Sequence, residues 1–398
     1  MGAREMESGG SAAFAADAGA SAPQRRLALF LSNGKSLSWW KEMGLFSREI
    51  ALYLRLLEIG ALDRILVFSF DARDRAFLAE LAGQEPLYGR FELVAPSHGS
   101  FRRVAGLLWG VRAAVRHRRK IATADVLKTN QVDSLAAALP AALLTGRPLV
   151  FRMGYQLSRR FAMNGQKLPA LLARLLEEVG YRVAKRVLVT SREMEERLAA
   201  DPRLAGKIVR TPTYVDVGLF TPVDAADFDQ PLVAVGRLTP QKNLLALVRA
   251  CALAGTGLTL VGEGELEAEL RALADALGVP LHLAGTVPNE ALPALLRRHS
   301  LFILPSLHEG LPKVLIEAMA MGMICIGSRI DGITDLIRDG ENGYLIDGFT
   351  PEAIAAAIVR ARTERRAELG RAARRTVEET FSLELYADRE AALYRTLA

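Results

Sequence analysis

Short apolar runs alternate with longer amphipathic stretches along most of the chain. The runs are almost continuously hydrophobic, as in strands of a parallel sheet that is covered on both faces. We expect strands at 27–32, 64–70, 124–129, 148–153 and 186–191, and again at 231–236, 258–262, 281–285, 301–306 and 324–328. Helical periodicity between them favours helices that include 46–59, 134–145 and 167–185. The pattern predicts an α/β protein.

The alternation of strands and helices occurs twice, which predicts two doubly wound, Rossmann-like domains facing a central cleft. We expect an N-terminal domain at 25–214 and a C-terminal domain at 215–381. Residues 382–398 are expected to form a helix that crosses back to the N-terminal domain. Residues 1–24 are rich in Ala, Gly and Ser, which favours a disordered tail.

The length, charge and cysteine content of the chain limit the possible binding partners only slightly. A length of 398 residues suits two domains, and the net charge of +6 with a pI of about 9.4 favours an acidic partner. That partner could be a phosphorylated substrate, nucleic acid or anionic lipid, although an ordinary solvated basic surface would look the same. Cys251 and Cys325 stand in apolar surroundings without disulfide or metal spacing. With no secretory signal and no apolar run of about 18 residues, we expect a cytoplasmic protein.

The segment 304–347 carries the strongest chemical signal. Glu309 and Glu317 stand on either side of a Gly310–Leu311–Pro312 turn that opens a predicted helix. The start of a helix offers unpaired N–H groups and a positive dipole end, which together favour an anion such as phosphate. Glu317, in the early turns, could accept hydrogen bonds from a sugar diol. The segment therefore favours a nucleotide-sugar site.

A second signal lies in 234–243, where a predicted strand ends at Gly236 and Arg237 and Lys242 follow. The glycine leaves room for a ligand, and the two cations are suited to phosphate oxygens and to a diphosphate leaving group. Alone, this segment could be an ordinary surface loop. Combined with the glutamate-bearing segment, it favours the functional interpretation.

Together, VGRLTPQKN and HEGLPKVLIEAMAMG resemble the retaining glycosyltransferases of family four with the GT-B fold, the clan of glycogen synthases, sucrose synthases and lipid-linked mannosyltransferases. Further similar segments follow in order at 215–222, 260–270, 284–306, 335–346 and 380–394. The resemblance covers roughly 186–395.

The resemblance implies that the N-terminal domain, 25–214, binds the acceptor and that the C-terminal domain, 215–381, binds the nucleotide-sugar donor. It also implies a role for each matching residue. Arg237 and Lys242 would hold the donor diphosphate, Glu317 the ribose hydroxyls, and Glu309 would lie near the transferred sugar; Glu309, Arg237 and Lys242 are the expected catalytic residues. Other donor contacts would come from Gly236, Gly262, Thr286, Val287, Gly310 and Leu311. The family needs no metal ion and no cofactor besides the nucleotide-sugar donor, and it retains the anomeric configuration.

The N-terminal half departs from the family pattern. Gly34 fits the glycine loop after the first strand, but Lys128 and Arg152 stand where relatives often carry a histidine. We expect Gly34, Lys128, Arg152 and Tyr155 on the acceptor side. Lys128 and Arg152 could equally be structural cations at strand ends.

One basic stretch, 101–121, has a helical apolar stripe of Phe101, Val104, Leu108, Val111 and Val115. Seven Arg or Lys residues and no acid accompany the stripe, as in helices that lie on anionic membranes. Alternatively, the stripe packs on the sheet and the cations face water.

Other functional classes find little support. Glu267 replaces the third glycine of a dinucleotide fingerprint, and Pro312 occupies the place of the second histidine of a zinc helix. Basic residues do not interleave with aromatic ones, so no nucleic acid partner is expected. We therefore expect a hexosyltransferase that moves a hexose from a UDP- or GDP-sugar to a lipid-linked glycan in cell-surface polysaccharide assembly. We expect the enzyme to act at the inner face of the membrane. The alternatives are a sugar-nucleotide epimerase, a phosphorylase or a non-catalytic nucleotide-binding module.

Overall fold

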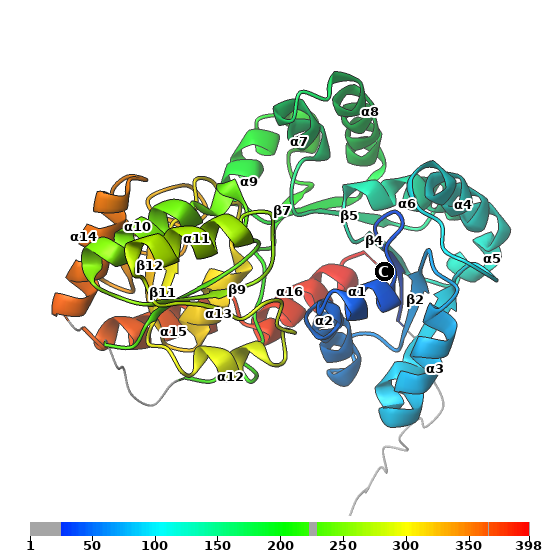
Figure 1. Cartoon of the computed structure of the whole chain (residues 1–398). Coiled ribbons are helices and arrows are strands. Elements are labelled where there is room, and N and C mark those ends of the chain that lie inside the picture. The colour runs from blue at the N-terminus through cyan, green and yellow to red at the C-terminus, as the bar shows by residue number, and fades with distance from the viewer. Residues whose placement is uncertain (1–24, 223–228, 365, 398) are drawn as a thin grey trace, which may run out of the picture.

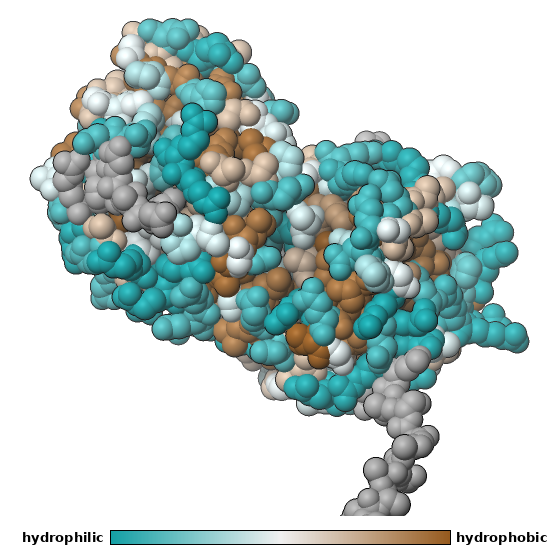
Figure 2. Space-filling view, turned by 90° about the horizontal axis from the view of Figure 1, so that it is seen from below, coloured by the Kyte–Doolittle hydropathy of each residue, from teal (hydrophilic) through white to brown (hydrophobic). Residues whose placement is uncertain are grey.

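The computed structural model describes residues 25–222, 229–364 and 366–397. The predicted tail, 1–24, lies outside the described residues. The chain forms two α/β domains, each built on one parallel sheet (Figure 1). Figure 2 shows the surface notched between the two lobes, with hydrophobic residues gathered around the waist.

The N-terminal sheet has seven strands in the order β3-β2-β1-β4-β5-β6-β7, and every neighbouring pair is parallel. The strands are β1 (Arg26–Phe30), β2 (Arg64–Phe68), β3 (Phe91–Val94), β4 (Val126–Thr129), β5 (Leu149–Met153), β6 (Arg186–Val189) and β7 (Ile208–Arg210). The order reverses beside β1, between β1 and β4, where doubly wound sheets bind ligands.

The C-terminal sheet has six strands in the order β10-β9-β8-β11-β12-β13, also all parallel. They are β8 (Leu232–Val235), β9 (Leu258–Val261), β10 (Leu281–Leu283), β11 (Leu301–Leu304), β12 (Ile324–Ser328) and β13 (Tyr344–Ile346). The corresponding switch point lies between β8 and β11. The predicted fold of two doubly wound domains is confirmed.

All ten expected strands are present, and three more were missed: β3, β7 and β13. Each of the three is the last strand at one edge of its sheet and only three or four residues long.

Two layers of helices cover the N-terminal sheet. One consists of α4 (Arg103–Arg116), α5 (Arg118–Ile121), α6 (Leu135–Thr145) and α8 (Lys167–Val183), and α7 (Leu157–Met163) packs against α8. The other contains α1 (Leu37–Glu42), α2 (Phe46–Glu58) and α3 (Asp74–Gln84). Helix α9 (Arg192–Ala199) precedes β7.

The C-terminal sheet is covered in the same way. Helices α10 (Leu244–Ala254), α11 (Glu267–Leu277) and α14 (Pro351–Glu364) bury one core with its first face. The second face of the sheet is covered by α12 (Leu292–Leu296), α13 (Lys313–Ala320) and α15 (Glu368–Thr380), which form a second hydrophobic core with it.

The last helix, α16 (Leu383–Arg395), belongs to the N-terminal core although it follows the C-terminal domain in sequence. Its side chains Leu383, Tyr386, Ala387 and Tyr394 are buried among those of α2 and the N-terminal sheet. In Figure 1 it is the red helix between the lobes. The helix therefore ties the two domains together.

Candidate functional site

Lys242 and Glu309 meet at the carboxyl ends of β8 and β11. The Lys242 Nζ atom donates to Glu309 Oε1 at 2.6 Å, although the residues are 67 positions apart. The two loops are joined again by Gln241, whose side-chain amide donates to the His308 carbonyl at 2.9 Å and whose own carbonyl accepts from the Leu307 amide at 2.9 Å. The two segments singled out in the sequence thus form one site at the switch point of the sheet.

Glycines allow the loops of this site to pack backbone against backbone. Gly262 has a φ of +134°, and a Cβ atom there would lie 2.1 Å from the Gly236 carbonyl oxygen. Gly332 has a φ of +80°, and a Cβ atom there would lie 1.4 Å from the Gly310 carbonyl oxygen. Neither position has room for a side chain, so both close approaches depend on glycine.

Several hydrogen-bond donors at this site have no protein partner in the described part of the chain. Arg237 is exposed, and its side chain makes no hydrogen bond or ion pair with a described residue. The amides of Gly310 and Leu311, just before α13, donate to no described group either. Gly310 and Leu311 directly follow Glu309 in sequence, and Arg237 lies in the same loop as Lys242. Cationic and amide donors on these two loops suit an anion with several oxygen atoms.

Glu317 lies inside α13 and is only 1% exposed. Its Oε1 atom accepts from the Asn289 side-chain amide at 3.1 Å, whereas Oε2 has no partner among the described residues. Burial raises the pKa of the Glu317 carboxyl, and nearby Lys313 and Arg48 oppose the rise. A buried carboxylate oxygen without a partner is costly, and hydroxyl donors of a ligand would satisfy it.

Lys313 stands one turn before Glu317 in the same helix, with its Nζ atom 4.5 Å from the centre of the Tyr214 ring. Burial, with repulsion from Arg48, lowers the pKa of Lys313 to about 8. The site therefore contains a weakly held proton beside the buried carboxylate.

The loop that carries Thr286 and Val287 lies between the two domains. The Thr286 amide donates to Glu263 Oε1 at 3.4 Å. A few residues on, the Asn289 amide donates to the Gly44 carbonyl at 3.4 Å, and Ser47 Oγ donates to Glu290 Oε2 at 2.8 Å. Because Asn289 also holds Glu317, this loop connects the buried carboxylate to the N-terminal domain.

On the acceptor side, Gly34 follows β1 with a φ of +72°, and a Cβ atom there would lie 3.1 Å from the Cα of Arg102. Lys128 requires a correction. It is 0% exposed and its Nζ atom donates to both oxygens of Glu390, at 2.6 and 2.7 Å. It is therefore a structural cation, because no substrate can reach it in this arrangement.

Arg152 and Tyr155 lie on either side of the end of β5. Arg152 is half-buried and donates to the Asn130 carbonyl at 3.0 Å, so it supports the loop after β4. Tyr155 is 37% exposed, and the guanidinium of Arg160 lies 5.4 Å from its ring centre. Tyr155 thus lies at the surface, where a ligand can reach it.

One acidic residue of this region escaped the sequence interpretation. Asp133 lies directly after β4, in a short 3₁₀ turn (Val132–Ser134) at the switch point of the N-terminal sheet. Its Oδ1 atom has no partner among the residues that the structure describes. Burial raises the pKa of this carboxyl, while hydrogen bonding from Ser32 and the charge of Lys35 lower it. A polar residue just past a strand at the switch point is the signal that could have found it.

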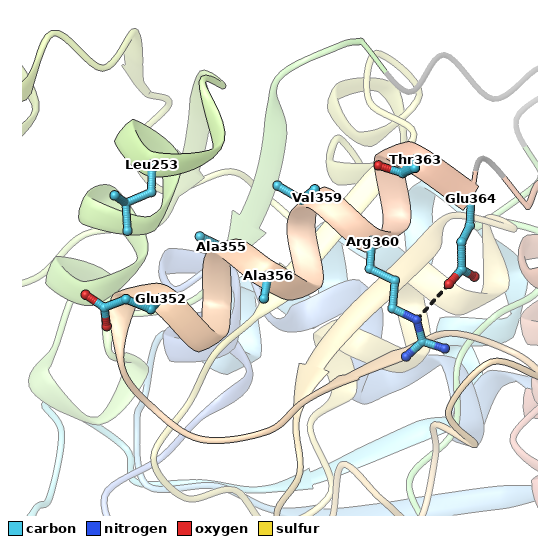
Figure 3. Close-up of a pocket in the computed structure, with 8 residues that line it drawn as sticks. All are labelled: Leu253, Glu352, Ala355, Ala356, Val359, Arg360, Thr363 and Glu364. Carbon is cyan, nitrogen blue, oxygen red and sulfur yellow. Dashed lines mark hydrogen bonds and ion pairs between the residues drawn. The ribbon is translucent and has the colours of Figure 1, made fainter.

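A separate shallow hollow lies on the C-terminal domain between α10 and α14 (Figure 3). Its walls are Leu253, Val359 and alanines, and the charged pair Arg360–Glu364 is joined across 2.9 Å. It includes none of the residues above and offers no group suited to a diphosphate.

Residues 226–376 match the family described as "Glycosyl transferases group 1". The chain is 31% identical over 235 residues to the "Amylovoran biosynthesis glycosyltransferase AmsK" of Erwinia amylovora, covering 55% of this chain and 56% of that protein. It is 28% identical over 261 residues to the "UDP-Gal:alpha-D-GlcNAc-diphosphoundecaprenol alpha-1,3-galactosyltransferase" of Escherichia coli, covering 59% of this chain and 66% of that protein. The chain thus spans between about half and two thirds of these relatives.

Solved structures show the same architecture over nearly the whole chain. Sucrose-phosphate synthase from Thermosynechococcus elongatus superposes with a TM-score of 0.74 at 21% identity, covering 94% of this chain and 99% of that one. Anabaena Alr3699/HepE in complex with UDP superposes with a TM-score of 0.71 at 20% identity, covering 94% and 100%. Residues 226–376 thus match the group 1 glycosyl transferase family, and the chain shares the GT-B fold of the solved structures.

Proposed function

We propose that this protein is a retaining hexosyltransferase that moves a hexose from a UDP- or GDP-sugar to a lipid-linked glycan in cell-surface polysaccharide assembly. One observation carries the proposal: the 2.6 Å contact between Lys242 and Glu309 joins the loop that carries Arg237 to the start of the helix that carries Glu317. Among the described residues, the Arg237 side chain and the Glu317 Oε2 atom have no hydrogen-bond partner. Cations and amide donors suit a diphosphate, and a buried carboxylate suits a ribose diol.

Relatives support the substrate classes. The Escherichia coli relative is named for a UDP-Gal donor and a diphosphoundecaprenol-linked acceptor. A relative from Mycolicibacterium smegmatis, 29% identical, is a GDP-mannose-dependent phosphatidylinositol monomannoside mannosyltransferase. HepE has also been solved in complex with UDP-glucose. Both nucleotides therefore occur among the similar proteins, and lipid-linked acceptors recur.

In the proposed reaction, the bond between the sugar and the diphosphate breaks and the nucleoside diphosphate leaves with the electron pair. Arg237 and Lys242 stabilise the negative charge that develops on it. The acceptor hydroxyl attacks from the same face, gives its proton to a diphosphate oxygen and forms the new glycosidic bond, so the configuration is retained. Glu309, held by Lys242, supports the positive charge of the sugar ring.

We assign the acceptor side to the loops after β1, β4 and β5. Asp133 is placed to accept a hydrogen bond from an acceptor hydroxyl, since its Oδ1 atom is free of protein partners among the described residues. Tyr155 and the Gly34 loop complete this side. In this assignment Asp133 takes the place of Lys128 as the charged acceptor-side residue, because Lys128 forms an ion pair with Glu390.

Incubation of the purified protein with a panel of radiolabelled UDP- and GDP-hexoses, with and without a lipid-linked acceptor, tests the proposal. We expect one donor to be consumed slowly alone and rapidly with acceptor, with label moving to the lipid and the anomeric configuration unchanged by NMR. Label that stays nucleotide-linked as a different hexose would indicate an epimerase instead. Label released as sugar phosphate in the presence of inorganic phosphate would indicate a phosphorylase. A protein that binds nucleotide and turns over no donor would be a non-catalytic module.

A further inference from the structure

Two helices of one layer of the N-terminal domain expose rows of large apolar side chains. In α4 the row is Val104, Leu107, Leu108, Val111 and Val115, with exposed fractions from 39% to 68%. In α8 it is Leu168, Leu171, Leu172, Leu175 and Val179, from 42% to 66%. Helix α6 lies between them and contacts both (Figure 1), and its own Leu143 and Leu144 are exposed as well. We call these three rows the apolar layer.

Small residues explain why the large ones face outward. Gly106, Gly110, Ala113 and Ala114 form the buried face of α4, and a Cβ atom on Gly110 would lie 3.0 Å from that of Ala137 in α6. In α8, Ala173 and Gly180 are buried. The alternative that the α4 stripe packs on the sheet is therefore wrong. Phe101 is the one member of the predicted stripe that is not exposed with the others, because its ring stacks on Trp109.

Several arginines around the apolar layer have no acidic partner among the residues that the structure describes. Arg112, Arg116 and Arg119, on α4 and α5, are exposed and form no ion pair with a described residue. Arg174, on α8, is likewise exposed and unpaired within the described ranges. The acids of α8 are engaged, because Glu177 accepts from Ser158 and Glu178 pairs with Arg182 and Arg203. A second copy of the chain would bring like charges together.

The apolar layer also borders the proposed acceptor side. At the start of α4, a Cβ atom on Gly106 would lie 2.1 Å from Asn33 Oδ1, in the loop after β1. At the other end of the layer, Arg160 of α7, the helix packed on α8, lies over Tyr155. No helix among the described residues is long and apolar enough to cross a bilayer. Apolar rows with a basic rim are instead typical of helices that lie in a membrane interface.

We propose that the apolar layer docks the protein on an anionic membrane surface, with α8 as a second insertion helix beside α4. The evidence for this interaction is the composition of the exposed surface. Only the delivery of a lipid-linked acceptor to the site rests on the function proposed above.

Sedimentation of the full chain with vesicles tests the proposal. We expect binding to vesicles of mixed phosphatidylglycerol and phosphatidylcholine, weak binding to phosphatidylcholine alone, and loss with rising salt because the cationic contribution is screened. The triple variant Leu171→Ser, Leu172→Ser, Leu175→Ser should weaken the apparent affinity by at least about tenfold, because three apolar side chains no longer insert. Arg112→Gln, Arg116→Gln, Arg119→Gln should remove the preference for the anionic lipid.

The hollow between α10 and α14 supplies a matched control, since Leu253 and Val359 are 62% and 48% exposed on the other domain. Leu253→Ser, Val359→Ser should sediment like the wild type. The proposal would be overturned if the α8 variant sedimented with vesicles as the wild type does. It would also be overturned if the wild type bound no vesicles and formed a dimer that the α8 variant converts to a monomer. Donor hydrolysis in the same samples separates the two proposals: a variant that hydrolyses donor normally and does not sediment affects only the membrane contact.

Discussion

Lys128 and Glu390 form a fully buried ion pair that joins the N-terminal sheet to the last helix of the chain. The Nζ atom lies 2.6 and 2.7 Å from the two carboxylate oxygens, and neither side chain is exposed. Tyr394, one turn further along α16, also donates to Glu390. Burial lowers the pKa of Lys128, and the charge of Glu390 opposes that shift. The pair fixes α16 against β4 rather than contacting substrate.

We predict that Lys128→Met destabilises the protein by about 3–5 kcal/mol, because it leaves the Glu390 charge buried without a counter-charge. Urea unfolding followed by circular dichroism measures the loss. The double variant Lys128→Met, Glu390→Leu should recover most of it, since replacing both members of a buried pair is often nearly neutral. Equal stability of the wild type and the single variant would contradict the structural role.

The sequence left open whether Lys128 contacts substrate or is a structural cation, and its burial against Glu390 favours the second interpretation. Sequence places a cation at the end of a strand, but its burial is set by a helix 262 positions further along. The same limit applies to α8. Its sequence shows a helical period of apolar residues, but it does not show which face of the helix is buried. That choice depends on how closely Ala173 and Gly180 let the helix approach its neighbours, which is a property of packing.

The residues proposed for the donor side lie in two short segments of the sequence. Gly236, Arg237 and Lys242 fall within one strand end and turn, and Glu309 and Glu317 border one helix start. Only the 2.6 Å contact between Lys242 and Glu309 needed the fold. The proposed acceptor side draws on three separate loops, so the position of Asp133 at the switch point becomes evident only when the strand order is known.

Arg237→Ala and Lys242→Ala should each lower kcat by about 10²–10³-fold, because both cations act on charge that develops in the transition state. Lys242→Ala should also raise the KM for donor, since Glu309 then faces the diphosphate without its partner. Arg249→Ala, an exposed arginine on α10, is the control and should behave as wild type. Near-normal turnover in both variants would refute the donor site.

Gly332→Ala should disturb the donor site, whereas Gly278→Ala should affect only stability. Both glycines have left-handed backbones, with φ of +80° and +67°. A Cβ on Gly332 would collide with the Gly310 carbonyl, while nothing lies within 4 Å of a Cβ on Gly278. We expect Gly278→Ala to cost on the order of 1 kcal/mol with nucleotide affinity unchanged. Isothermal titration with UDP and GDP should show weakened binding for Gly332→Ala alone.

Asp133→Asn should make the protein more stable and less active at neutral pH. Burial raises the pKa of Asp133 in the folded state, so the folded protein holds that proton more tightly than the unfolded chain does. The ionised carboxylate therefore opposes folding above the unfolded pKa of about 3.9, and its cost disappears as the pH falls below that value.

Thermal unfolding from pH 3 to pH 8 checks this sign: the variant should gain stability above about pH 4 and lose the advantage below it. Transfer to acceptor should fall while donor hydrolysis persists, because the asparagine keeps the shape and loses the charge that attracts the hydroxyl. A variant that is less stable than wild type at pH 7 and transfers normally would show that Asp133 serves the fold. Such a stability gain at the expense of activity is expected where a buried carboxylate is kept for a ligand.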